Sequence, residues 1–98
     1  MFSSIVDDNI PPSVFGCPQD ITVTGETSTI VTWTPPIATD NSGVIASSYS
    51  NYDSGDVFPL GSTEVVYGWV DASGNEATCS FTVTVAMGKY HRLLNYLI

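Results

Sequence analysis

The chain has 98 residues, of which 43% are hydrophobic, and this is enough for one small domain with a modest core. Ten Asp and Glu residues stand against one Lys and one Arg, Lys89 and Arg92, which both lie in the last ten positions. Such a surface excludes nucleic acid as a partner, because phosphate binding needs Lys and Arg. No apolar run approaches the roughly 20 residues that cross a bilayer, so membrane insertion is not expected.

The first half of the chain contains four candidate strands, which are short runs rich in Val, Ile, Thr or aromatic residues. In the third run, Val31 and Trp33 fall on one face. Pro35 and Pro36 follow and should end that strand, because proline cannot donate a ladder hydrogen bond. The four segments are 13–15, 20–24, 29–36 and 44–50.

The second half contains the two strongest strand patterns. Segment 62–71 has apolar residues on both faces, which predicts a strand that is covered on both sides. Segment 77–85 alternates apolar residues with Ser and Thr, the period of a strand with one buried face. The inward residues predicted for the two strands are Val65, Tyr67 and Trp69 in the first and Cys79, Phe81, Val83 and Val85 in the second.

The predicted fold is all-β, a sandwich of about 6–8 short antiparallel strands. Turn-forming Gly, Pro, Asp and Asn separate the strands, and no stretch repeats with a helical period. The domain is expected to span residues 7–86, with residues 1–6 as a flank and residues 87–98 as a tail outside the domain. The tail breaks the strand pattern and is interpreted as a linker, a weak helix or read-through from an incomplete gene model.

Two cysteines bracket almost the whole domain. Cys17 precedes the segment 20–24 and Cys79 lies on the last strand, so they can form a disulfide if these two strands are neighbours. The alternative is a pair of buried free thiols. A structural zinc site is not expected, because zinc takes four ligands and the single histidine, His91, lies far away in the tail.

Three short acidic loops raise the question of a metal site. Segments 40–43, 53–56 and 71–74 read DNSG, DSGD and DASG. Asp and Gly are favoured in turns for backbone reasons alone, so the loops are predicted to be turns, with no metal ligand and no cofactor. In the alternative, loops at one end of the sandwich converge with Asp7 and Asp8, and a neighbouring repeat completes a calcium site.

Ordered motifs between positions 7 and 85 resemble the hyalin repeat, or HYR domain. They are a paired Pro before Cys-Pro, a Trp strand, P-x-A-T-D-N-S-G, F-P-x-G, V-x-Y, D-x-x-G-N and C-x-F-x-V-x-V. The resemblance implies an immunoglobulin-like sandwich in an extracellular protein that takes part in cell adhesion or matrix assembly, often in tandem repeats. It also implies that Cys17 and Cys79 are the family's cysteine pair. Ala77 stands where antibody domains carry a Tyr, so the bridge should join the terminal strands.

The chain differs from a complete protein of that family in having one repeat, no signal peptide and an unrelated tail. It is therefore interpreted as a piece of a longer secreted chain, with neighbouring repeats and an extracellular or cell-surface protein as its partners. No enzymatic activity is expected, because the tail residue His91 leaves no credible nucleophile–base pair.

Four aromatic residues are candidates for a binding surface. Trp33 and Trp69 are in phase with apolar neighbours and are predicted to pack in the core, although each could instead be a stacking platform for carbohydrate. Tyr49 and Tyr52 stand among Ser, Asn and Asp in a stretch expected to be an exposed loop, and they are the candidates for partner binding. Three functions follow as hypotheses: an adhesion or matrix module, a structural spacer repeat, and a carbohydrate- or calcium-binding β-module.

Overall fold

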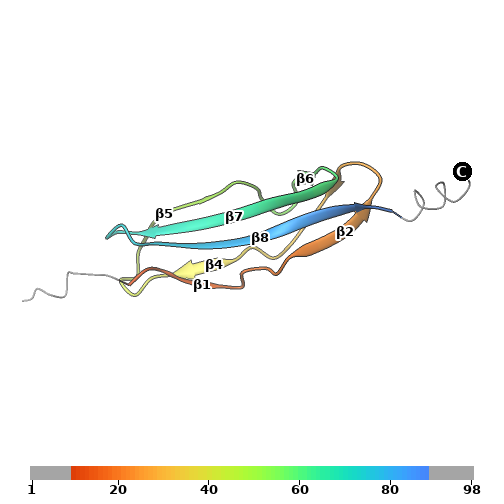
Figure 1. Ribbon diagram of the computed structural model, residues 1–98. Helices are drawn as coiled ribbons and strands as arrows, with labels where there is room; N and C mark the ends of the chain where they lie inside the picture. The colour runs from red at the N-terminus through yellow and green to blue at the C-terminus, as the bar shows by residue number, and fades with distance from the viewer. Residues whose placement is uncertain (1–9, 89–98) are drawn as a thin grey trace, which may run out of the picture.

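The computed structural model describes residues 10–88, which form eight strands in two layers (Figure 1). The predicted flank 1–6 and the tail beyond Gly88 lie outside the described residues. No helix within residues 10–88 is long and apolar enough to cross a membrane. The strands are β1 (Ser13–Phe15), β2 (Ile21–Gly25), β3 (Thr29–Ile30), β4 (Ile37–Thr39), β5 (Ile45–Ser50), β6 (Val57–Phe58), β7 (Gly61–Asp71) and β8 (Glu76–Met87).

One layer is a four-stranded sheet in the order β2-β8-β7-β5. The long antiparallel hairpin of β7 and β8 forms its centre, with Val65 opposite Phe81 and Thr63 opposite Val83. Both Val65 and Val83 are completely buried, the alternation predicted for segment 77–85 is confirmed, and segment 62–71 is half-buried or buried on both faces from Val65 onward, as its pattern indicated. A two-residue period with one buried face thus places this hairpin over the core.

The second layer consists of two short antiparallel ladders, β1 with β4 and β3 with β6. Phe58 on β6 is fully buried in the core cluster, and Val14 and Ala38 pack against that cluster from β1 and β4. The two ladders thus cover the apolar face of the four-stranded sheet. The all-β sandwich expected from the sequence is confirmed, and its organisation is consistent with an immunoglobulin-like fold.

The segment predicted as a strand over 29–36 forms a strand only at its first two residues. Beyond them the chain is held by the loop after β5: Val31 N–H donates to the Asp56 carbonyl, and Trp33 N–H donates to Ser54 Oγ at 2.8 Å. These bonds satisfy the backbone without a long ladder. The segment still buries Val31, so the inward direction predicted for this residue is correct although the strand is not.

The pairing of β2 with β8 is parallel, whereas the sequence led us to expect antiparallel strands throughout. Ile21 lies opposite Val83 and Gly25 lies opposite Met87, and the Gly88 N–H donates to the Gly25 carbonyl beyond the last pair. Parallel strands need a long crossover. Here the crossover is nearly the whole domain, because β2 and β8 are the second and the last strands of the chain.

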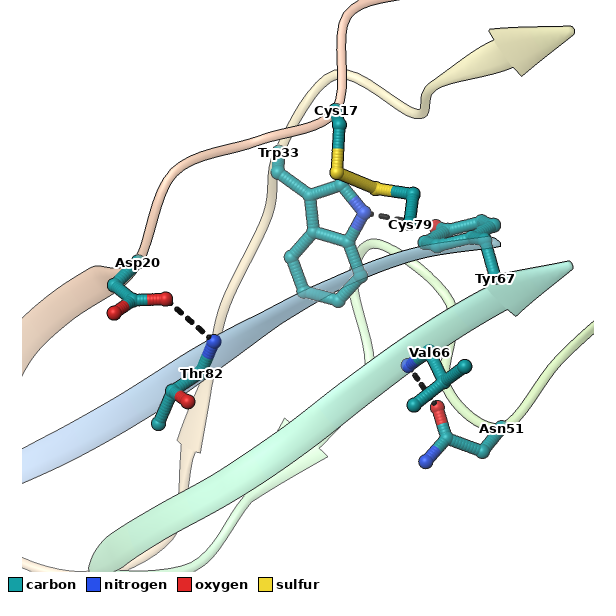
Figure 2. The surroundings of a disulfide bond; sticks show 8 residues. All are labelled: Cys17, Asp20, Trp33, Asn51, Val66, Tyr67, Cys79 and Thr82. Carbon is teal, nitrogen blue, oxygen red and sulfur yellow. Dashed lines mark hydrogen bonds between the residues drawn. A yellow bond between two sulfur atoms is a disulfide. The ribbon is translucent and has the colours of Figure 1, made fainter. Parts of the chain in front are cut away.

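A disulfide joins Cys17, just before β2, to Cys79 on β8, and their Cα atoms are 5.7 Å apart (Figure 2). The predicted pairing is confirmed, and so is its cause, since β2 and β8 are hydrogen-bonded neighbours. The bond therefore joins the segment between β1 and β2, near the start of the domain, to the last strand, whereas the bridge expected from Ala77 was between the first and last strands.

Side chains extend the ladder at both edges of the four-stranded sheet (Figure 2). Before β2, Asp20 Oδ1 accepts the Thr82 N–H of β8 at 2.9 Å. After β5, Asn51 Oδ1 accepts the Val66 N–H at 2.8 Å while Asn51 Nδ2 donates to the Glu64 carbonyl at 3.0 Å. The Asn51 amide thus takes the place of one further peptide unit, because it offers a donor and an acceptor side by side.

Candidate interaction site

Tyr49 is an exposed aromatic residue on β5, with 49% of its surface accessible. Its ring covers the backbone of Gly68 on β7, where a Cβ atom would collide with the ring. Its hydroxyl donates to Glu76 Oε2 on β8 at 2.7 Å, so the side chain reaches across three strands. This hydrogen bond, followed by partial desolvation and the charge of Glu76, raises the pKa of Tyr49 above its ordinary value.

Tyr52, the second residue proposed for partner binding, has a different environment. It lies after β5, is half-buried, and packs on the core residue Phe58 with ring centroids 4.9 Å apart. The expectation of one exposed loop that carries both tyrosines is therefore wrong, because Tyr49 is on β5, as the predicted strand 44–50 indicated, and Tyr52 contacts the core. Of the two rings, Tyr49 is the one that is open to a partner.

A groove of about 430 Å³ lies beside Tyr49. Its wall on β5 carries two small residues, Ser48 and Ser50, which stand opposite Trp69 and Tyr67 of β7. Because serine is small, it leaves space beside this aromatic pair on the β5 side. The volume falls in the range of ordinary ligand pockets. The lining residues are Pro36, Ser48, Tyr49, Ser50, Tyr67 and Trp69.

The aromatic side chains of the groove are fixed in place by the core. Tyr67 and Trp69 stack with centroids 6.1 Å apart and ring planes 12° from parallel. The Tyr67 hydroxyl accepts the Trp33 indole N–H at 2.8 Å (Figure 2). Trp33 also meets Phe81 edge-on at 5.2 Å. Stacking and the part-buried hydrogen bond leave these rings little freedom, so the groove is preformed.

These contacts decide the predictions for the two tryptophans. Trp69 is only 8% exposed, and the expectation of a buried core residue is confirmed. Trp33 is half-buried rather than mostly buried, but it packs against the core cluster. Neither ring stands free on the surface as a carbohydrate-stacking platform would. Trp69 nevertheless lines part of the groove.

Two carboxylates accept hydrogen bonds from residues that line the groove. Glu76 accepts the Tyr49 hydroxyl, and Asp53 Oδ1 accepts the Ser50 hydroxyl at 3.0 Å. Residues 10–88 contain no Lys, Arg or His, so no cation of the described chain neutralises these groups. Uncompensated negative charge therefore lies on both faces of β5, at Asp53 beside the groove and at Glu76 beside Tyr49.

Strand β5 is an edge strand, because it pairs with β7 on one side and with no described strand on the other. Its register with β7 shifts between Ile45 and Ser47, and the pairing is regular from Ser47 to Ser50. An edge strand presents every second N–H and C=O group away from its sheet. The β5 wall of the groove, the tyrosine ring and this open backbone thus belong to the same four-residue stretch, Ser47–Ser50.

The acidic loops 40–43 and 71–74 are turns, as predicted. Asp40 Oδ2 accepts the Ser42 N–H at 3.0 Å, and its carbonyl accepts the Gly43 N–H. Asp71, which is 2% exposed, accepts the Ser73 and Asn75 N–H groups through Oδ1 at 2.9 and 2.8 Å. Both carboxylates are therefore used inside their own loops, the function of Asp in an Asx turn.

Opposing effects act on the pKa of Asp71. Desolvation is the largest of them and raises the pKa. It is outweighed by the hydrogen bonds from the side chain and N–H of Asn75 and from the Ser73 N–H, so that the pKa lies below its ordinary value. Asp40 Oδ1 is buried without a hydrogen-bond partner. No group of three or more His, Cys, Asp or Glu within residues 10–88 is arranged to hold a metal ion, and Asp7 and Asp8 lie outside the described residues.

The sequence singled out Tyr49 but missed the groove beside it. The signal was the alternation S-Y-S at positions 48–50, which places two small side chains on one face of an edge strand and the tyrosine on the other. Pro36 and Glu76 are brought to this site by the tertiary fold, and no local pattern in the sequence indicates that they belong to it.

The fold and the disulfide define a small, disulfide-bonded β-sandwich module. The family model described as "HYR domain" matches residues 7–85, and the chain belongs to the HYR domain family.

Curated relatives agree with this assignment. The chain is 46% identical over 81 residues to "Hyalin" of Strongylocentrotus purpuratus, covering 80% of this chain and 7% of that protein. It is 37% identical over 86 residues to "Hyalin" of Lytechinus variegatus, covering 84% of this chain and 16% of that protein. It is 40% identical over 74 residues to the mouse "Sushi, von Willebrand factor type A, EGF and pentraxin domain-containing protein 1", covering 70% of this chain and 2% of that protein. The chain thus spans a small part of the relatives it matches.

Proposed function

We propose that the chain is an extracellular protein-interaction module that serves cell adhesion or matrix assembly, and that it has no enzymatic activity of its own. Membership of the HYR family and relatives many times its length support a unit that works beside neighbouring repeats. The disulfide supports an oxidising compartment, because such bonds form and persist outside the cytosol. The division into a flank of residues 1–6, a domain of residues 7–86 and a tail of residues 87–98 is part of this proposal.

The observation that carries the proposal is the exposed Tyr49 on an open strand edge beside a preformed groove. Tyrosine provides a large contact area at a low cost in conformational entropy, which is why binding surfaces are enriched in it. A spacer repeat, the alternative function, does not require an aromatic residue in such a position. A carbohydrate- or calcium-binding module is the other alternative.

A bead-adhesion assay tests the proposal. Beads coated with the oxidised domain should retain cells of the source organism or the adjoining repeats of the same protein, and beads coated with Tyr49→Ala should retain fewer. Tyr49→Phe keeps the ring and serves as the matched control. Equal retention by the native domain and by uncoated beads would support the spacer function. Retention that needs added calcium or is blocked by free glycan would support the third function.

A further inference from the structure

We propose that the open edge of β5 and the adjoining groove receive an extended segment of a partner protein, and that this segment carries Lys or Arg on alternate residues. The inference deepens the proposed function, because it rests on this face being the protein-binding surface. It commits to a partner of stated chemistry, a basic β-strand that adds to the sheet at Ser47–Ser50.

The backbone of β5 provides the first requirement. The regular part of this edge strand, Ser47–Ser50, offers outward N–H and C=O groups to another strand. Its side chains are small or lie flat, so they do not block an incoming strand. An extended peptide can therefore form a ladder here, as peptides do when they add to a free sheet edge.

The two faces of β5 provide the second requirement, which is recognition of side chains. Successive residues of an added strand point to opposite faces of the sheet. Residues on the inner face would enter the groove beside Ser48 and Ser50 and contact the edges of Tyr67 and Trp69. Residues on the outer face would lie beside the ring of Tyr49. The site therefore fits a partner strand in which small apolar residues alternate with residues that can contact the face of a tyrosine ring.

Charge determines which residues belong on the outer face. On this face Glu76 accepts the hydrogen bond of Tyr49, whereas Asp53 accepts that of Ser50 beside the groove, and no basic residue lies within residues 10–88. Arg or Lys over a tyrosine ring is attracted to its π face, and nearby carboxylates strengthen that attraction. A second copy of this chain would instead bring like charge, since each copy carries a net charge of −8.

Fluorescence anisotropy with a labelled peptide, Thr-Arg-Val-Arg-Val-Arg-Thr, tests this inference. We expect saturable binding to the oxidised domain with a Kd below about 1 mM, weakening as salt is added. The neutral peptide Thr-Gln-Val-Gln-Val-Gln-Thr should bind less tightly. In an extended peptide the N–H groups of successive residues point to opposite edges. N-methylation of the Val residues therefore blocks one edge, and N-methylation of the Arg residues blocks the other. Only the peptide whose unblocked edge faces β5 should keep the affinity of the parent. Equal binding by these two peptides overturns the strand pairing.

Variants of the domain test whether the peptide binds at the β5 edge. Glu76→Gln and Asp53→Asn should each weaken binding about two- to fivefold, the size of exposed charge contacts. Tyr49→Ala should weaken it by a similar factor. The matched control is Glu26→Gln, the same charge change about 35 Å away along the sheet, and it should leave the affinity unchanged. An equal loss in Glu26→Gln would show diffuse charge attraction and overturn the inference.

Two outcomes separate this inference from the function on which it rests. If beads coated with Glu76→Gln and Tyr49→Ala retain cells as well as the native domain does, the adhesion function stands and the β5 site is overturned. Sedimentation showing a dimer that Ser48→Pro disrupts would overturn the basic partner in favour of a second copy. Competition of the peptide by free Arg but not by neutral glycans supports the site as proposed.

Discussion

Trp33 donates its indole N–H to the hydroxyl of Tyr67 at 2.8 Å, and this hydrogen bond joins the two layers of the sandwich (Figure 2). Trp33 lies in the irregular segment after β3, and Tyr67 lies in the middle of β7. This one bond therefore holds two parts of the domain in place. One is the segment after β3, which forms no strand ladder, and the other is the wall of the groove that Tyr67 forms.

Tyr67→Phe should lower the free energy of unfolding by about 1 kcal/mol, because the half-buried indole of Trp33 loses its acceptor while the ring packing remains. Thermal melts of the variant and the native domain measure the change. Tyr49→Phe removes a hydroxyl whose bond to Glu76 is exposed, and as a control it should change stability less. Equal melting of Tyr67→Phe and the native domain would contradict the structural importance of this bond.

Removal of the disulfide should destabilise the domain by about 4 kcal/mol, because the unfolded chain is no longer constrained by a loop that spans 62 positions. The double variant Cys17→Ser, Cys79→Ser and the reduced native protein should behave alike in urea unfolding. The oxidised protein should show no thiol that reacts with Ellman's reagent after it is unfolded. A reactive thiol in the unfolded, unreduced protein would contradict the bridge.

Acid should destabilise the domain through Asp71. The folded-state pKa of this carboxyl lies below its ordinary value, so its charged form is favoured by folding. The resulting stability is present above the unfolded-state pKa of about 3.9 and is lost as the pH falls through the lower folded-state pKa. Unfolding curves between pH 7 and pH 2 measure this loss. Asp71→Asn should be less stable at pH 7 and should show a smaller loss on acidification.

Tyr49 should titrate above the ordinary tyrosine pKa, and Glu76→Gln should bring its pKa back down. The Glu76 carboxylate accepts the hydrogen bond of the neutral phenol O–H, and its negative charge opposes formation of the tyrosinate, so its neutralisation weakens both effects. NMR titration of the ring signals measures the shift. Gly68→Ala should act in the same direction, because its Cβ displaces the ring from the backbone of β7. Identical titration in the native domain and in both variants would contradict the contact.

Local sequence patterns determined the parts of the fold where one face of a strand is buried. The alternation in β7 and β8 gave both strands to within about two residues, and the turn chemistry of Asp40 and Asp71 placed the corners. The strands β4 and β6 were missed, because three and two residues are too few for a period to show.

The site was predicted less completely than the fold, for a physical reason. Tyr49 was recognised because an aromatic residue among polar neighbours is unusual. Whether it lay on a loop or a strand depended on the pairing of β5 with β7, and the burial of Tyr52 depended on Phe58. Such contacts join residues that are distant in the sequence, so composition and periodicity carry no signal of them.

The parallel pairing of β2 with β8 has a mechanical consequence. The chain enters through β1 at one end of the sandwich and leaves through β8 at the other (Figure 1). Tension applied to the two ends of the domain would therefore pull along the strands, and without the disulfide it would load the β2–β8 hydrogen bonds together in shear. Cys17 and Cys79 carry that load covalently across 62 positions. About 200 Å of chain is thereby kept from extending, and a module under tension stays short while its disulfide is intact.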